Sequence, residues 1–127
     1  MKNTIVITGG AGFVGSNLIV LLLKRTKFKI ISIDNYSTGK IKNHINDQRV
    51  TYIREDTKNI RKILKNKISR IKTIFHFGEF SRIYQSFLKM NDCISSNSIG
   101  SNEVFNFCLS NKIKLIYSAT SASIGNR

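Results

Sequence analysis

Short apolar runs alternate with longer amphipathic stretches along this 127-residue chain. The runs are rich in isoleucine and valine, and the stretches between them carry apolar residues at helical spacing. This alternation predicts a parallel sheet whose strands are joined by crossover helices. The expected strands are Asn3–Thr8, Lys29–Asp34, Val50–Arg54, Thr73–Phe77 and Lys114–Ser118. The expected helices are Gly12–Arg25, Lys58–Asn66, a short one near Arg82–Leu88, and Asp92–Ser110.

Right-handed crossovers arrange these strands in the order 3-2-1-4-5, a Rossmann-like, doubly wound α/β fold that ends after strand 5. In such a fold a ligand binds beside strand 1, where the strand order reverses. Within the first helix, Val14, Leu18, Leu21 and Leu22 share one face. The stretch Ile41 to Asp47 is equally compatible with a short helix and an ordered loop.

A glycine-rich loop separates the first strand from the first helix. Gly9 can adopt a backbone conformation closed to other residues, and Gly12 lets the main chain approach a pyrophosphate. Gly15 lets the helix pack closely on its strand, and the helix N-terminus offers free N–H groups to an anion. The loop, with Phe13 and Val14 in it, therefore predicts a phosphate cradle.

Asp34 ends the second apolar run, 19 positions after Gly15. Its carboxylate can accept both ribose hydroxyls of adenosine, whereas a 2′-phosphate would face that same negative charge. None of the next three residues, Asn35, Tyr36 and Ser37, is a cation, so we expect NAD rather than NADP as the cofactor. The alternative is that Asp34 only caps the next turn, but the strand, loop and helix around it favour the cofactor role.

Four segments occur in a characteristic order: Thr8–Gly15, Asp34–Gly39, Phe75–Gly78 and Tyr117–Gly125. In this order and spacing the chain resembles the extended short-chain dehydrogenases, most closely the NAD-dependent epimerase/dehydratase family that acts on nucleotide sugars. The resemblance covers nearly the whole chain but reaches only the N-terminal half of such an enzyme. It implies NAD as cofactor, a nucleotide-sugar substrate, isomerase or lyase activity, and a homodimer at full length.

The resemblance also implies cofactor contacts around the adenosine. Asn35, Ser37, Thr38 and Gly39 match the family's Asp-Asn-x-Ser-Thr-Gly stretch. Asp56, just after the third strand, is implied to contact the adenine amino group. Its alternative role is an N-cap for the following helix, and the two roles are about equally supported.

After the fourth strand, Phe77 and Gly78 resemble the apolar-small pair beside which the family's cofactor ribose and nicotinamide pass. Glu79 departs from the family's small residue and places a carboxylate near the nicotinamide end. His76 points away from its strand neighbours, which favours a hydrogen-bonded core residue over a catalyst. Asn97 matches the family's Asn-x-x-Gly and is implied to lie at the cofactor, although an ordinary polar helix residue is nearly as well supported.

The fifth strand runs into small hydroxyl residues. Counting back from Gly125 in the family's Ser/Thr-x-x-x-x-Gly pattern places the catalytic hydroxyl at Thr120, with Ser121 as the competing choice. The resemblance implies that this hydroxyl binds the sugar 4-hydroxyl while a tyrosine removes the proton, hydride passes to NAD and a ketosugar forms.

That tyrosine belongs to a Tyr-x-x-x-Lys pair, which in relatives lies beyond the position of Arg127. Tyr36 and Lys40 have the same spacing, but they follow Asp34 in the adenosine loop. We therefore do not interpret them as the catalytic pair. We therefore expect this chain to be a single incomplete NAD-binding domain, inactive alone. A stand-alone NAD-binding module or redox sensor is the alternative.

The chain carries 21 Lys and Arg against 7 Asp and Glu, a net charge of +14. The cations are scattered and lack interleaved aromatic residues, which argues against specific nucleic-acid binding. The longest apolar run, Leu18 to Leu23, is too short to cross a membrane, and we expect no basic-apolar-small leader before the first strand. Cys93 and Cys108 are expected as reduced packing residues of a cytoplasmic protein, and His44 as an isolated, exposed polar residue.

Overall fold

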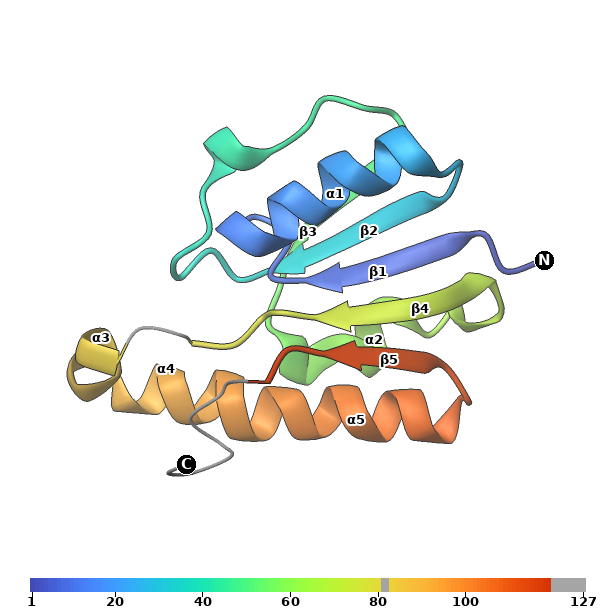
Figure 1. Ribbon diagram of the computed structural model, residues 1–127. Coiled ribbons are helices and arrows are strands. Elements are labelled where there is room, and N and C mark those ends of the chain that lie inside the picture. Colours follow the sequence, from blue (N-terminus) through green and yellow to red (C-terminus); the bar gives the residue numbers. More distant parts are fainter. Residues whose placement is uncertain (81–82, 120–127) are drawn as a thin grey trace, which may run out of the picture.

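The computed structural model describes residues 1–80 and 83–119 and contains a five-stranded sheet in the order β3-β2-β1-β4-β5 (Figure 1). All four neighbouring pairs are parallel, which confirms the expected Rossmann-like topology. The strands are β1 (Thr4–Thr8), β2 (Lys29–Asp34), β3 (Val50–Arg54), β4 (Ile71–His76) and β5 (Lys114–Tyr117). Their carboxyl ends lie together at one edge of the sheet (Figure 1).

Helices cover both faces of the sheet, with α1 on one face and α2 and α5 on the other (Figure 1). The α-helices are α1 (Phe13–Arg25), α2 (Ile60–Leu64), α3 (Ile83–Leu88), α4 (Met90–Ile94) and α5 (Ser101–Ser110). Short 3₁₀ turns occur at η1 (Ile41–Asn43), η2 (Thr57–Asn59) and η3 (Ile68–Arg70). The single helix expected over residues 92–110 is instead α4, a π-helical turn η4 (Ser95–Gly100) and α5 in direct succession.

Alternate side chains of the central strand β1 point to opposite faces of the sheet and belong to two separate cores. Val6 packs with Ile33, Ile74 and Phe107 in the core beneath α2 and α5. Ile5 and Ile7 pack with Ile19 of α1 and Ile30 of β2 in the second core. Because β1 is covered on both faces, all five of its residues are buried.

The buried face of α1 overlaps the expected one only in part. Val14 and Leu21 are 58% and 50% exposed, whereas Gly15 and Ile19 are buried. The cause is the close packing of Gly15, where a Cβ would lie 2.2 Å from the Gly9 carbonyl oxygen. This contact sets the rotation of the helix, so the line through Gly15 and Ile19 faces the sheet, Leu18 and Leu22 of the predicted face pack beside it, and Val14 and Leu21 do not.

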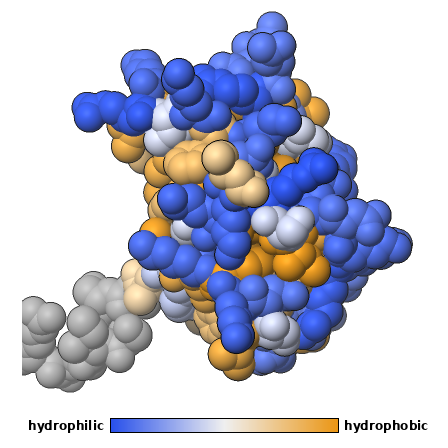
Figure 2. All heavy atoms as spheres, turned by 90° about the vertical axis from the view of Figure 1, so that its right-hand side faces the viewer, coloured by the Kyte–Doolittle hydropathy of each residue, from blue (hydrophilic) through white to orange (hydrophobic). Residues whose placement is uncertain are grey.

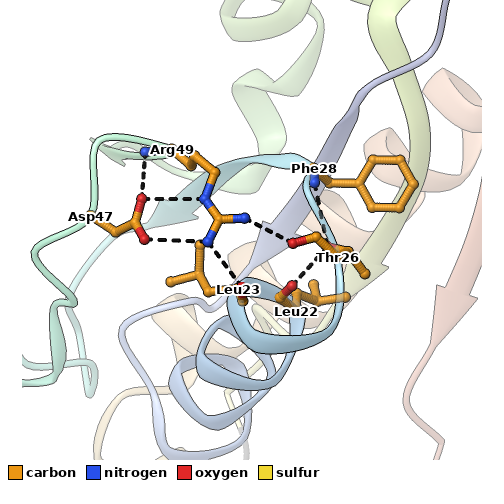
Figure 3. Close-up of polar contacts among 6 residues, drawn as sticks. All are labelled: Leu22, Leu23, Thr26, Phe28, Asp47 and Arg49. Carbon is orange, nitrogen blue, oxygen red and sulfur yellow. Dashed lines mark hydrogen bonds and ion pairs between the residues drawn. The ribbon is translucent and has the colours of Figure 1, made fainter.

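Arg49 caps the C-terminus of α1 from the loop before β3 (Figure 3). Its guanidinium donates to the carbonyls of Thr26 at 2.8 Å and Leu23 at 2.9 Å, and Asp47 pairs with it at 3.4 Å. The Thr26 hydroxyl donates to the Leu22 carbonyl at 2.7 Å. These bonds satisfy carbonyls that a helix end leaves unpaired and hold the β2–β3 connection against α1.

The face at the amino ends of the strands, opposite the edge where the carboxyl ends meet, is largely hydrophilic with small apolar patches (Figure 2). No helix within residues 1–80 and 83–119 is long and apolar enough to cross a membrane.

Candidate functional site

A cavity of about 330 Å³ opens at the carboxyl ends of β1, β2 and β4. Part of its lining, here called the glycine side, comes from the end of β2 and from the segments that follow β1, β2 and β3. These residues are Gly9, Gly12, Phe13, Val14, Gly15, Ile33, Asp34, Asn35, Ser37, Thr38, Glu55 and Thr57. The opposite part, here called the β4 side, consists of Phe77, Gly78, Glu79, Ser96 and Ser118. The cavity therefore lies where the strand order reverses.

The glycine loop leaves no space for a side chain at Gly9. Gly9 has a φ of 75°, and a Cβ there would lie 2.8 Å from the Phe77 carbonyl carbon and oxygen. Gly12 starts α1 without any side-chain cap, and the first turn of the helix contains no acidic residue. Helix geometry leaves the N–H groups of this turn without carbonyl partners, so they face the cavity as donors for an anion.

Asp34 is held by main-chain donors on the glycine side. One carboxylate oxygen accepts from the Ala11 N–H at 3.0 Å, and the other accepts from the Tyr36 N–H at 2.8 Å. Gly39 packs beneath it, because a Cβ on Gly39 would lie 2.8 Å from Asp34 Oδ2. Each carboxylate oxygen retains a lone pair for a further donor, which is the arrangement that binding of two ribose hydroxyls requires.

A buried chain of side-chain hydrogen bonds runs behind the β4 side. The Thr8 hydroxyl accepts from the N–H groups of Phe77 and Gly78, at 3.1 and 2.9 Å. Its own proton must therefore go to His76 Nδ1, 2.6 Å away. His76 Nε2 then carries the ring proton and donates to Ser101 Oγ at 2.7 Å.

The chain ends at a carboxylate that lines the cavity. Ser101 Oγ donates to Glu79 Oε2 at 2.8 Å, and the Tyr117 hydroxyl donates to the same oxygen at 3.3 Å. His76 is fully buried, and this burial lowers its pKa, against the opposing effect of Glu79. His76 is thus the neutral, hydrogen-bonded core residue that the strand alternation predicted.

The family model for the NAD dependent epimerase/dehydratase family matches residues 5–127. The chain belongs to this family. The resemblance seen in the motifs is thereby confirmed, and NAD is the cofactor named in the family's description.

Solved structures of family enzymes share the fold. The UDP-N-acetylglucosamine 4-epimerase of Methanobrevibacter ruminantium, solved with UDP-N-acetylmuramic acid, is 32% identical, with a TM-score of 0.81 over all of this chain and 41% of that one. The UDP-glucose 4-epimerase of Thermotoga maritima, solved with UDP-glucose, is 25% identical, with a TM-score of 0.79 over 92% of this chain and 38% of that one.

The Bordetella bronchiseptica enzyme WbmH, solved with NAD⁺, has a TM-score of 0.86 at 19% identity over all of this chain and 42% of its own, a likeness that shows the fold alone. The chain thus spans about two fifths of the length of these three structures.

Most of the predicted cofactor residues line the cavity, but Gly39, Asp56 and Asn97 do not. Asp56 lines an adjoining hollow and accepts from the Asn35 amide at 3.0 Å. It occupies the N-cap position of η2, but its side chain makes no capping hydrogen bond. The capping alternative is therefore wrong for its side chain, and the adenine contact stays a prediction.

Asn97 holds the segment after β4 in place. Its amide oxygen accepts from the Phe80 N–H, and its amide nitrogen donates to the Phe80 carbonyl at 2.9 Å. Three residues on, Gly100 packs against Thr57, since a Cβ there would lie 2.2 Å from Thr57 Oγ1. In this structure Asn97 is thus a positioning residue, and its contact with a cofactor stays a prediction.

Sequence reasoning missed five lining residues and misjudged His44. Ile33, Glu55, Thr57, Ser96 and Ser118 line the cavity. Four of them flank strand ends, which is a usable signal, whereas Ser96 reaches the cavity through the π-helical turn. His44 is half-buried: its Nε2 lies 2.7 Å from the Tyr36 hydroxyl, and its ring stacks on Tyr52 at 3.7 Å between centroids. Thr120 and Ser121 lie outside the described residues.

Proposed function

We propose that this chain is the NAD-binding portion of a nucleotide-sugar epimerase or dehydratase. The observation that carries the proposal is the single cavity lined by the glycine loop, the first turn of α1 and Asp34. Helix-terminal N–H groups suit a pyrophosphate, and a carboxylate across the loop suits a ribose. Membership of the NAD-dependent family supports the same assignment.

Different groups of lining residues would contact different parts of such a cofactor. The N–H groups at Phe13, Val14 and Gly15 would hold the pyrophosphate, and Asp34 would hold the adenosine ribose. Asn35, Ser37 and Thr38 would surround the adenosine, with Asp56 in the adjoining hollow near the adenine. The nicotinamide would then lie on the β4 side, beside Phe77, Gly78 and Glu79.

NAD is proposed over NADP because Asp34 faces the position of a 2′-phosphate. Arg54 lines the adjoining hollow, and its guanidinium carbon lies 4.6 Å from the centre of the Tyr36 ring. That cation–π contact engages Arg54 with Tyr36. The carboxylate at the ribose position therefore dominates the choice between the two cofactors.

The chemistry that NAD supplies when bound is reversible hydride transfer with the substrate. In this proposal Thr120 supplies the hydroxyl that binds the reacting hydroxyl of the sugar. The intermediate is a ketosugar, which then gives either the epimer or the dehydrated product. The proton-abstracting Tyr-x-x-x-Lys pair and the sugar pocket are assigned to a segment outside these 127 residues. On this proposal the complete enzyme is a homodimer.

A cytoplasmic location is proposed on the state of the cysteines. Cys93 and Cys108 are both free thiols in the structure, and burial raises the pKa of Cys108 to about 11. A buried, protonated thiol is unreactive and suits a reducing compartment.

Calorimetric titration of the 127-residue chain with NADH and NADPH tests the proposal. We expect NADH to bind more tightly than NADPH, and Asp34→Asn to weaken NADH binding by about 10- to 100-fold through loss of charge-assisted hydrogen bonds. Asp47→Asn is the matched control, because Asp47 is a hydrogen-bonded carboxylate beside Arg49 at the far end of α1. It should leave binding within about twofold. Tighter binding of NADPH, or an equal loss in both variants, would contradict the proposal.

Activity assays test the assignment of the proton-abstracting pair to a segment outside residues 1–127. With NAD⁺ and UDP-glucose we expect no epimer and no dehydrated product by chromatography, because the proton-abstracting pair is missing. Turnover by this chain alone would show that the catalytic groups lie within residues 1–127, against the proposal.

A further inference from the structure

Glu79 places a fixed carboxylate on the β4 side of the cavity, across β1 from Asp34. Its Oε2 accepts from two hydroxyls on different elements, Ser101 on α5 at 2.8 Å and Tyr117 on β5 at 3.3 Å. Asn97 fixes the adjacent Phe80 backbone from η4. The side chain is therefore held by two elements, and the main chain next to it is held by a third.

The groups that hold this carboxylate are dipoles and carry no charge of their own. Thr8, Ser101 and Tyr117 contribute hydroxyls, and proton counting along the chain makes His76 neutral. Burial and the neighbouring Glu79 raise the pKa of Tyr117, so this phenol remains a donor. Within the part of the chain that the structure describes, the ion pairs are Arg49–Asp47 and Arg61–Glu103, and Glu79 belongs to neither.

We propose that Glu79 makes the cavity select the oxidised form of its cofactor, NAD⁺, over NADH. This inference rests on the proposed function, which puts the nicotinamide on the β4 side. The nicotinamide ring is a cation when oxidised and neutral when reduced. A fixed negative charge in a partly enclosed cavity favours the cation, whereas the hydroxyl dipoles around it hold the charge in place without cancelling it.

A purely structural role for Glu79 is the competing explanation. The carboxylate links the segment after β4 with β5 and α5 through two hydrogen bonds. Loss of such a link would loosen the site and weaken both cofactor forms alike. The ratio of the two dissociation constants therefore separates an electrostatic role from a structural one.

The test is titration of the chain with NAD⁺ and, separately, NADH. The wild-type chain should bind NAD⁺ more tightly. In Glu79→Gln, which keeps the shape and an acceptor oxygen, the ratio of NAD⁺ to NADH affinity should fall by about tenfold, the order expected for one unit charge at an effective dielectric constant near 20 with partial screening. Tyr117→Phe is the matched control, because it removes one bond to Glu79 but no charge, and it should leave the ratio within about twofold.

Each outcome decides the inference. An unchanged ratio in Glu79→Gln, with both forms still bound, overturns this inference alone. Tighter binding of NADH by the wild-type chain also overturns it, and that measurement needs no variant to fold. Binding of neither form overturns the proposed function together with this inference.

Discussion

The two sides of the cavity are built in different ways. On the glycine side, Asp34 is positioned by the main-chain N–H groups of Ala11 and Tyr36, and glycines provide the space. On the β4 side, Glu79 is positioned by side chains from β5 and α5, with His76 and Thr8 behind them. One side therefore depends on backbone conformation, and the other depends on a specific set of partners brought together by folding.

The two sides are therefore sensitive to different substitutions. A backbone cradle tolerates many neighbouring side chains but no added Cβ at its closest contacts. A series of hydrogen-bonded side chains tolerates small changes of shape. It does not tolerate the removal of one side chain, because each removal leaves a buried donor or acceptor unpaired. Four perturbations, in order of decreasing effect, test this contrast.

Gly15→Ala should have the largest effect. The added methyl would lie 2.2 Å from the Gly9 carbonyl oxygen and 2.8 Å from the Gly10 Cα, both of them main-chain atoms that cannot move aside. We expect a loss of about 3 kcal/mol in the free energy of unfolding, measured by urea denaturation. Gly12→Ala is the control within the same loop: its Cβ would lie 3.3 Å from the Gly9 oxygen, so the fold should survive while NADH binding weakens. Equal stability of the two variants would argue against the backbone cradle.

His76→Leu should break the β4 side. The substitution removes the bonds to Thr8 and Ser101, at 2.6 and 2.7 Å, from a fully buried position. We expect the free energy of unfolding to fall by about 2 kcal/mol, because two hydroxyls lose a partner inside the protein. His44→Leu, at a half-buried ring near the glycine side, should cost less than about 1 kcal/mol. A smaller loss for His76→Leu than for His44→Leu would show that the buried chain contributes little.

The same histidine predicts a dependence of stability on pH. Burial lowers the pKa of His76 below its ordinary 6.5, so the folded protein keeps the ring neutral while the unfolded chain takes up a proton below that pH. Stability from this group is fully present above pH 6.5 and is lost as the pH falls toward the folded-state pKa, with a slope of at most about 1.4 kcal/mol per pH unit. Urea denaturation between pH 7 and pH 5 should show a shallower decline in His76→Leu than in the wild-type chain.

Ser32→Ala should have the smallest effect, and it should be favourable. The Ser32 hydroxyl on β2 is buried and has no hydrogen-bond partner among the described residues. Removing it relieves an unsatisfied polar group, so we expect a gain of up to about 1 kcal/mol in urea denaturation. Thr8→Val on β1 is the contrasting control, because that hydroxyl is fully bonded, and it should destabilise. Destabilisation by Ser32→Ala would indicate that its hydroxyl has a partner after all.

Sequence alone determined the order of the five strands, the glycine loop and the position of Asp34. These features are local: strand and helix periodicity, together with glycine spacing, fixes each of them within a few residues. The predicted face of α1 was right for Leu18 and Leu22 and wrong for Val14 and Leu21, because the contact between Gly15 and Gly9 turns the helix away from its apolar pattern. The pattern marks apolar positions but does not contain the close approach of two main chains.

The β4 side, by contrast, depends on contacts between distant elements that no sequence pattern predicts. Thr8, His76, Ser101 and Tyr117 are up to 109 positions apart, and no spacing in the sequence links them. The π-helical turn at Ser95–Gly100 places Asn97 against Phe80. Nothing in the composition of this stretch predicts such a turn. Local patterns determine what the main chain does within one element, whereas the partners of a buried side chain depend on how distant elements pack.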